Sequence, residues 1–138
     1  MSEAETGTGR EEQRWSVDID WFDRNGRSFA TMAERCLCAA CRKRRREDRT
    51  RLSPQELIVN IRDCCSQEAG FITGATPIME SVFRLFLANG NQALDILDLG
   101  RQLSDRRGVD TYRTSSELLS RLLSKDRYYG IKPVENGG

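Results

Sequence analysis

The sequence contains no histidine, no glycine-rich phosphate loop and no Gly-x-Ser-x-Gly motif. Histidine is the side chain that enzymes use most often for acid–base catalysis, and the two motifs mark phosphate binding and serine nucleophiles. We therefore expect that the protein is not an enzyme. No apolar run approaches the roughly 20 residues of a membrane span, and the first residues are acidic and polar rather than signal-like. These absences predict a cytoplasmic protein.

The 138 residues are 38% hydrophobic and 31% charged, which suits one domain or two small modules that share a core. The net charge of +1 conceals a strong asymmetry. Residues 1–23 carry seven acidic residues against two arginines, a net charge of −5, whereas residues 42–51 carry seven basic residues against two acidic ones, a net charge of +5. The acidic stretch could fold back on the basic one or compete with an anionic partner for it.

All five cysteines lie in two short clusters, Cys36-Leu-Cys38-Ala-Ala-Cys41 and Cys64-Cys65. Cytoplasmic thiols stay reduced, and clustered cysteines then bind metal more often than they form disulfides. The Cys-x-x-Cys turn supplies two sulfurs and the distant pair supplies two more, which predicts Cys38, Cys41, Cys64 and Cys65 as ligands of a structural Zn²⁺. Cys36 is a variant ligand that could replace Cys64 or Cys65. An iron–sulfur cluster, free packing cysteines and a redox disulfide are the alternatives.

Cys36 also has a structural explanation. Ser28 is placed to cap a helix whose apolar face is Phe29, Met32, Ala33 and Cys36, at helical spacing. A buried cysteine behaves as a small hydrophobe, so this periodicity favours packing over metal binding for Cys36.

The pattern predicts a mainly helical chain. Alternation over Trp15–Trp21 indicates a strand, and Arg42–Arg51 is a polar loop or a solvated helical stretch. Ser53-Pro54-Gln55-Glu56 opens a helix that carries the second cysteine pair at the C-terminal end of its apolar face and ends over Gln67–Gly70. Further along, the predicted elements are a helix from Thr76 to Leu87, a short extended segment over 92–94, a helix capped by Asp95, a turn at 106–108, a helix that opens with a capping box at Thr114, and an extended segment over 127–134.

The order helix, short strand, helix, turn, helix and terminal extended segment over residues 76–134 resembles a winged helix-turn-helix. It is similar to the helical-wing domains associated with bacterial RNA polymerase delta subunits. The opening Trp-Phe…Asn-Gly-Arg-Ser-Phe and the cysteine clusters resemble a group of bacterial proteins with a similar Cys-rich N-terminal module. The expected organisation is a disordered acidic tail (1–14), a zinc-type module with four cysteine ligands (15–74), a winged-helix-like domain (75–134) packed on it, and a disordered end (135–138).

Two basic surfaces are candidates for nucleic-acid binding. The run at 42–46 could contact phosphates or could simply keep a loop solvated, and the winged-helix resemblance implies further contacts on and beside the third helix. The predicted contacts are Arg42, Lys43, Arg44, Arg45, Arg46, Arg106, Arg107, Arg113, Arg121 and Lys125. The expected function is a zinc-stabilised nucleic-acid-associated protein, such as a DNA-binding transcription factor. The alternatives are an adaptor that docks on RNA polymerase or another large assembly, and a thiol redox sensor.

Overall fold

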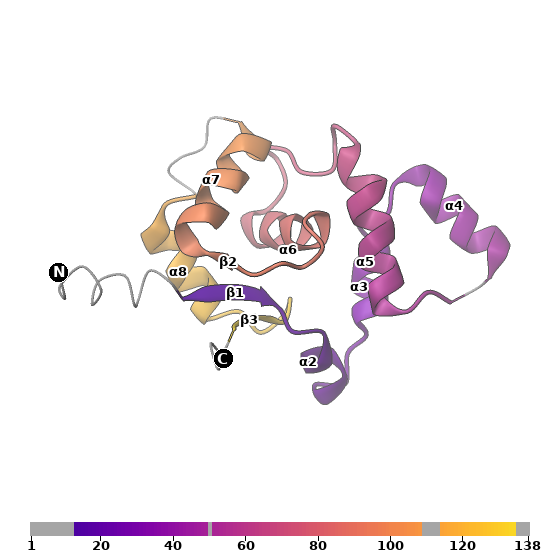
Figure 1. The fold of residues 1–138 in the computed structure, drawn as a ribbon, viewed down its shortest axis with the longest axis horizontal. Helices are drawn as coiled ribbons and strands as arrows, with labels where there is room; N and C mark the ends of the chain where they lie inside the picture. The colour runs from indigo at the N-terminus through magenta and orange to yellow at the C-terminus, as the bar shows by residue number, and fades with distance from the viewer. Residues whose placement is uncertain (1–12, 50, 109–113, 135–138) are drawn as a thin grey trace.

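A computed structural model describes residues 13–49, 51–108 and 114–134. The predicted mainly helical fold is confirmed, and its helices surround a small three-stranded antiparallel sheet (Figure 1). Most of the predicted acidic tail (residues 1–12) and the predicted disordered end (135–138) lie outside the described residues. The element order is β1 (Arg14–Val17), α2 (Ile19–Arg24), α3 (Phe29–Glu34), α4 (Ala39–Asp48), α5 (Pro54–Asp63), η1 (Cys65–Gln67), α6 (Ile78–Ala88), β2 (Leu94–Asp95), α7 (Ile96–Arg107), α8 (Ser116–Ser124) and β3 (Ile131–Pro133).

The sheet has the strand order β2-β1-β3, so the first strand of the chain lies in its centre. Trp15 is opposite Leu94 on one side and Pro133 on the other, and Val17 is opposite Ile131. Figure 1 shows the sheet beside α6, which is flanked by α7 on one side and by α5 on the other. The sheet therefore joins residues from both sides of the predicted module boundary at residue 75.

The predicted strand over Trp15–Trp21 is wrong beyond Val17, because the chain turns into α2 at Ile19. Just after β1, the N–H of Asp18 donates to the carbonyl of Gly130 (2.8 Å). The N–H of Trp21 then donates to the carbonyl of Asp18 (3.0 Å), within the turn that begins α2. Phe22, rather than Trp21, is then fully buried.

Side-chain caps fix three helix starts where the sequence predicted them. Ser28 caps α3, Ser53 and Glu56 form a complete capping box on α5, and Asp95 caps α7. Two boundaries differ from the prediction. Ser115 rather than Thr114 caps α8, and α7 continues through the residues predicted as a turn, up to Arg107.

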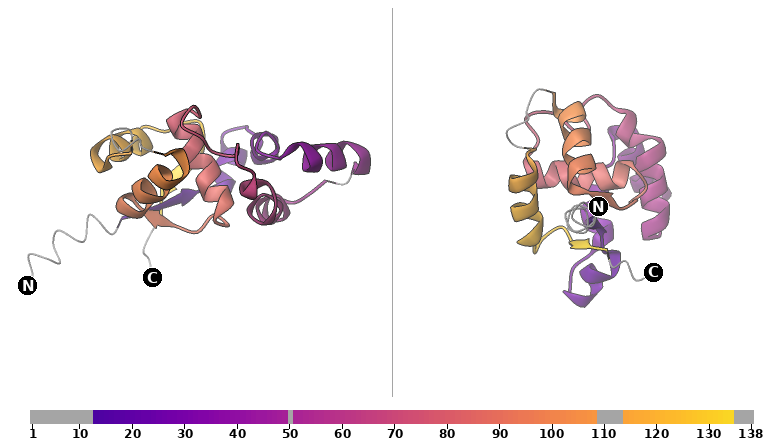
Figure 2. Two further views of the ribbon diagram at one scale, coloured as in Figure 1. Left: turned by 90° about the horizontal axis from the view of Figure 1, so that it is seen from above. Right: turned by 60° about the vertical axis from the view of Figure 1, so that its left-hand side comes forward.

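The buried residues form one continuous core that runs from Trp15 to Ile131. Leu57 and Ile61 of α5 are fully buried where this helix packs between α3 and α6. By contrast α4 projects away from the rest of the molecule, and only Cys41 on it is buried (Figure 2). The start of α4 lies next to the end of α5.

Among the described residues, no helix is both long enough and apolar enough to cross a membrane.

Candidate metal centre

Four of the five cysteines converge where α4 begins and α5 ends. The sulfur atoms of Cys38, Cys41, Cys64 and Cys65 all lie within 4.8 Å of one another, and the Sγ atoms of Cys41 and Cys64 are 3.6 Å apart. Four thiolates at about 2.3 Å from one tetrahedral ion would be separated by roughly 3.8 Å. The donor set and its dimensions therefore fit a metal ion bound by four thiolates.

The first two sulfurs come from the start of α4. Cys38 is the residue that precedes the helix, with an extended backbone (φ −72°, ψ 168°), and Cys41 occupies the third helical position. Both thiols thus lie at the positive end of the helix dipole, which favours the thiolate form. The guanidinium of Arg42 donates to the carbonyls of Leu37 (3.0 Å) and Arg35 (3.2 Å), and it braces the turn that leads into the helix.

The second two sulfurs are neighbours in the sequence, which in a regular helix would point about 100° apart. Here α5 ends at Asp63, and Cys64 takes a non-helical conformation (φ −128°, ψ −69°) before Cys65 opens the 3-10 turn η1. This break directs both sulfurs to the same point. The helix therefore ends earlier than the predicted 67–70, and the cysteine pair lies at the break that follows it.

Asn60 is part of the site, and the sequence reasoning missed it. Its side-chain amide donates to the sulfurs of Cys41 (3.2 Å) and Cys65 (3.5 Å). Its backbone carbonyl accepts a hydrogen bond from the N–H of Cys64 (3.0 Å). One residue therefore connects both cysteine pairs. The only signal in the sequence is its place one helical turn before Cys64, because no ligand motif includes an asparagine there.

The thiols of the cluster differ in acidity because they share hydrogen bonds. Burial raises the pKa of Cys41, but hydrogen bonds from Asn60 and the other three cysteines outweigh it and lower this pKa to about 7. Hydrogen bonding to Cys41 raises the pKa of Cys64 to about 11, and burial raises that of Cys65 to about 12. Without metal, a negative charge is thus better tolerated on Cys41 than on Cys64 or Cys65, which remain protonated.

Cys36 lies outside this group of four. It is buried after the end of α3, and its thiol is 3.9 Å from the carbonyl of Met32. Burial raises the pKa of Cys36 to about 11, so it stays a neutral thiol at physiological pH. Its position agrees with packing rather than with the variant ligand set.

The basic run at 42–46 lies on α4 and is helical. The side chains of Lys43, Arg44 and Arg46 are exposed, whereas Arg45 pairs with Asp48 (3.2 Å) and Arg42 braces the turn described above. Three cations of the run therefore face solvent on a helix that begins at the cysteine cluster.

The arginines near the end of α7 hold the fold together. Arg107 is buried, and its guanidinium donates to Ser81 Oγ (2.8 Å), to the carbonyl of Gly74 (3.3 Å) and to that of Thr76. This burial corrects the prediction that Arg107 contacts nucleic acid. Arg106 donates to the carbonyl of Ser66 (3.1 Å), next to the cysteine cluster. Arg113 lies outside the described residues.

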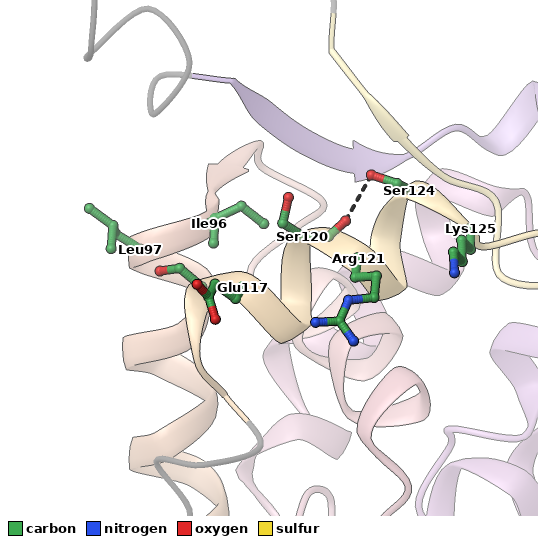
Figure 3. A pocket seen from close by; sticks show the side chains of 8 residues that line it. Ile96, Leu97, Glu117, Ser120, Arg121, Ser124 and Lys125 are labelled. Carbon is green, nitrogen blue, oxygen red and sulfur yellow. Dashed lines mark hydrogen bonds between the residues drawn. The ribbon is translucent and has the colours of Figure 1, made fainter.

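The remaining predicted contacts, Arg121 and Lys125, lie on the exposed face of α8. They line an open groove of about 770 Å³ between α8 and the start of α7, together with Ile96, Leu97, Ser116, Glu117, Ser120 and Ser124 (Figure 3). Leu97 is 56% exposed, and Glu117 places an acid in the same groove. The surface is therefore mixed in chemistry rather than strongly basic.

No family model, no curated protein sequence and no solved structure matches this chain. The functional assignment accordingly depends on the cysteine cluster and on the surfaces that the fold presents.

Proposed function

We propose that the protein is a zinc-stabilised nucleic-acid-associated protein. The observation that carries the proposal is the convergence of four thiols at the base of α4, whose outer surface is basic. Zinc bound by four thiolates has no open coordination position, so its role is structural and not catalytic. Even if two sulfurs lay on directly opposite sides of a single ion, the distance between them would be at most about 4.6 Å. The four sulfurs all lie within 4.8 Å of one another, which is close to that maximum. In an iron–sulfur cluster the four thiolates are divided among two or four irons, so at least some of the sulfurs must lie farther apart.

The metal would fix the position of the basic surface. Within the described residues, the start of α4 is held by Cys38 and Cys41, and the rest of the helix projects into solvent. Binding both pairs to one ion connects α4 to α5, which is itself packed in the core. Loss of the metal would therefore release the basic helix from the scaffold as well as destabilise the fold.

Phosphate contacts are proposed for Lys43, Arg44 and Arg46 on α4, and for Arg121 and Lys125 on α8. The order α6, β2, α7, α8, β3 supports a winged-helix-like arrangement in which α8 faces nucleic acid. In this chain the last strand of that segment, β3, pairs with β1, which lies outside the segment. Each phosphate that is neutralised releases counterions, so affinity should fall steeply with salt.

Two triple variants with the same change in net charge test this proposal. Lys43→Glu/Arg44→Glu/Arg46→Glu reverses the α4 surface. Arg121→Glu/Lys125→Glu/Arg127→Glu reverses the charge of α8 and of the segment that follows it, where Arg127 is also exposed. Binding of duplex DNA is measured by fluorescence anisotropy over a range of salt concentrations. The α4 variant should bind duplex DNA more weakly than the parent protein, and its affinity should depend less steeply on salt concentration. If the parent protein binds no nucleic acid at low salt, the proposal fails.

A second candidate is a protein adaptor, which the groove between α7 and α8 favours. Leu97 is exposed there beside Ile96, and charged and hydroxyl groups border the pair. A docking surface for RNA polymerase or another large assembly would have this composition. Copurification with such an assembly, abolished by Leu97→Glu, in a protein that binds no duplex DNA would favour the adaptor.

A thiol redox sensor is the third candidate. Cys64 is exposed, and its sulfur is 3.6 Å from that of Cys41. Oxidation of these two thiols by hydrogen peroxide would join them in a disulfide, release two waters and remove two metal ligands. Zinc that stays bound under mild peroxide would exclude this role.

A further inference from the structure

A second site with ligand-binding chemistry lies on the surface near α3, away from the four cysteines. A hollow of about 250 Å³ is formed by the turn between α2 and α3, by α3 itself and by the loop that follows α8. It is lined by two arginines, Arg27 and Arg35, by three hydroxyl residues, Ser28, Thr31 and Tyr128, and by Gly26 and Met32. No carboxylate lines it, so its polar groups are almost all potential hydrogen-bond donors.

The two arginines are arranged around aromatic rings. The guanidinium carbon of Arg27 is 4.1 Å from the centre of the Tyr128 ring and 5.9 Å from that of Trp21. Neither Arg27 nor Arg35 forms an ion pair with a carboxylate among the described residues. Arg35 and, to a lesser extent, Arg27 lower the pKa of Tyr128, which makes its hydroxyl a stronger donor.

Further positive charge lies close to the hollow. The guanidinium groups of Arg42 and Arg84 donate to the carbonyl of Arg35, at 3.2 and 3.4 Å. The nearby carboxylate of Glu80 is paired with Arg84 (3.0 Å). Arg27 and Arg35 thus have Arg42 and Arg84 close by, and the Glu80 carboxylate beside them is already paired. This positive charge, and the lack of a paired carboxylate for Arg27 and Arg35 among the described residues, favour an anionic ligand.

We propose that the hollow of Arg27 and Arg35 binds a phosphate group. Guanidinium groups bind phosphate through parallel charge-assisted hydrogen bonds, and the hydroxyls of Thr31 and Tyr128 add further donors. The phosphate of a single-stranded nucleic acid suits the site best, because the half-buried ring of Trp21 and the 43%-exposed Tyr128 provide stacking surfaces for a base beside it. This choice of source rests on the proposed association with nucleic acid, whereas free phosphate shares the same chemistry.

The site carries its own reporter. The chain has two tryptophans, of which Trp15 is buried in the sheet and Trp21 lies beside Arg27. The indole N–H of Trp15 is buried without a hydrogen-bond partner among the described residues. Trp15→Phe therefore removes no hydrogen bond in the described structure and leaves Trp21 as the only tryptophan. In this background, a short oligothymidylate should quench Trp21 fluorescence on binding, and inorganic phosphate should compete.

Matched variants separate this site from the rest of the surface. Arg27→Gln/Arg35→Gln should weaken oligothymidylate binding at least tenfold, because the variant loses the charge-assisted hydrogen bonds of both guanidinium groups. Tyr128→Phe should weaken it less. Arg24→Gln/Arg101→Gln removes the same charge from exposed positions elsewhere and should leave most of the affinity.

The outcomes are distinct from those for α4. If the parent binds oligothymidylate but the Arg27/Arg35 variant binds as well as the Arg24/Arg101 control, the phosphate site is refuted, while duplex binding through α4 is unaffected by that result. If inorganic phosphate binds at Trp21 but oligothymidylate does not, the phosphate site stands and its source is free phosphate. If neither probe binds the parent, the inference is overturned.

Discussion

Asn60→Leu removes the two hydrogen bonds that connect the cysteine pairs and leaves all four sulfurs in place. The Nδ2 atom of Asn60 is 3.2 Å from Cys41 Sγ and 3.5 Å from Cys65 Sγ, so the variant loses both donors at once. Leucine has a high helix propensity, and Asn60 is only half-buried on α5, so the helix should persist. We predict that the variant folds with zinc bound but holds the ion more weakly.

The magnitude follows from the role of donors that hydrogen-bond to metal ligands. Loss of such a donor typically costs about 10–100-fold in metal affinity. This range corresponds to about 1.4–2.8 kcal/mol. Asn60→Asp should be worse than Asn60→Leu, because it also places a carboxylate beside sulfurs that carry negative charge.

The assay is a competition titration in which a zinc-binding dye removes metal from the purified protein. Gln55→Leu is the matched control, since it makes the same amide-to-leucine change at an exposed position of the same helix. We expect the parent and Gln55→Leu to have equal zinc affinity. An Asn60→Leu protein that holds zinc as tightly as this control would refute the argument that the amide stabilises the thiolates.

Three further predictions concern single residues. Cys38→Ser should lower the melting temperature, chelation of the parent should do likewise, and the chelator should have little further effect on the variant, because metal binding supplies folding free energy; melting curves indifferent to both changes would reject a structural metal. Cys36→Ala should keep full metal content. As pH rises from 9.0 to about 11, the parent should lose up to about 2.7 kcal/mol of unfolding free energy through Cys36, since the folded thiol stays protonated where the unfolded one ionises. The Cys36→Ala variant should not show this loss, and identical pH profiles of parent and variant in denaturant titrations would contradict the argument. Gly130→Ala should cost about 2–4 kcal/mol and Gly26→Ala about 1–2 kcal/mol. Both have positive φ, but a Cβ at 130 would lie 2.7 Å from Phe22 Cε1 whereas one at 26 meets no atom within 4 Å; equal losses in denaturant titrations would refute the steric argument.

Local signals in the sequence were sufficient for several helix starts and for the four cysteines that cluster. The capping box at Ser53 defines the start of α5, and the apolar spacing that follows carries the helix to Cys64. The Cys-x-x-Cys spacing then leaves Cys64 and Cys65 as the only remaining source of a second pair. These inferences needed only residues close together in the chain.

The features that the sequence did not reveal depend on distant partners. The strand at Trp15 ends early because it meets the carbonyl of Gly130, and Arg107 is buried because the loop before α6 offers it acceptors. The placement of Arg27 beside Tyr128 likewise requires the turn after α2 to meet the segment after α8. From sequence alone a charged residue is predicted to be exposed, because the hydrogen-bond partners that would allow its burial lie elsewhere in the chain.

The most direct test of the metal centre is the metal content of freshly purified protein, measured by elemental analysis together with the visible spectrum. We predict a colourless protein with one zinc per chain, and loss of that zinc in Cys41→Ser but not in Cys36→Ala. A protein without bound metal, or a brown protein that contains iron, would contradict the account.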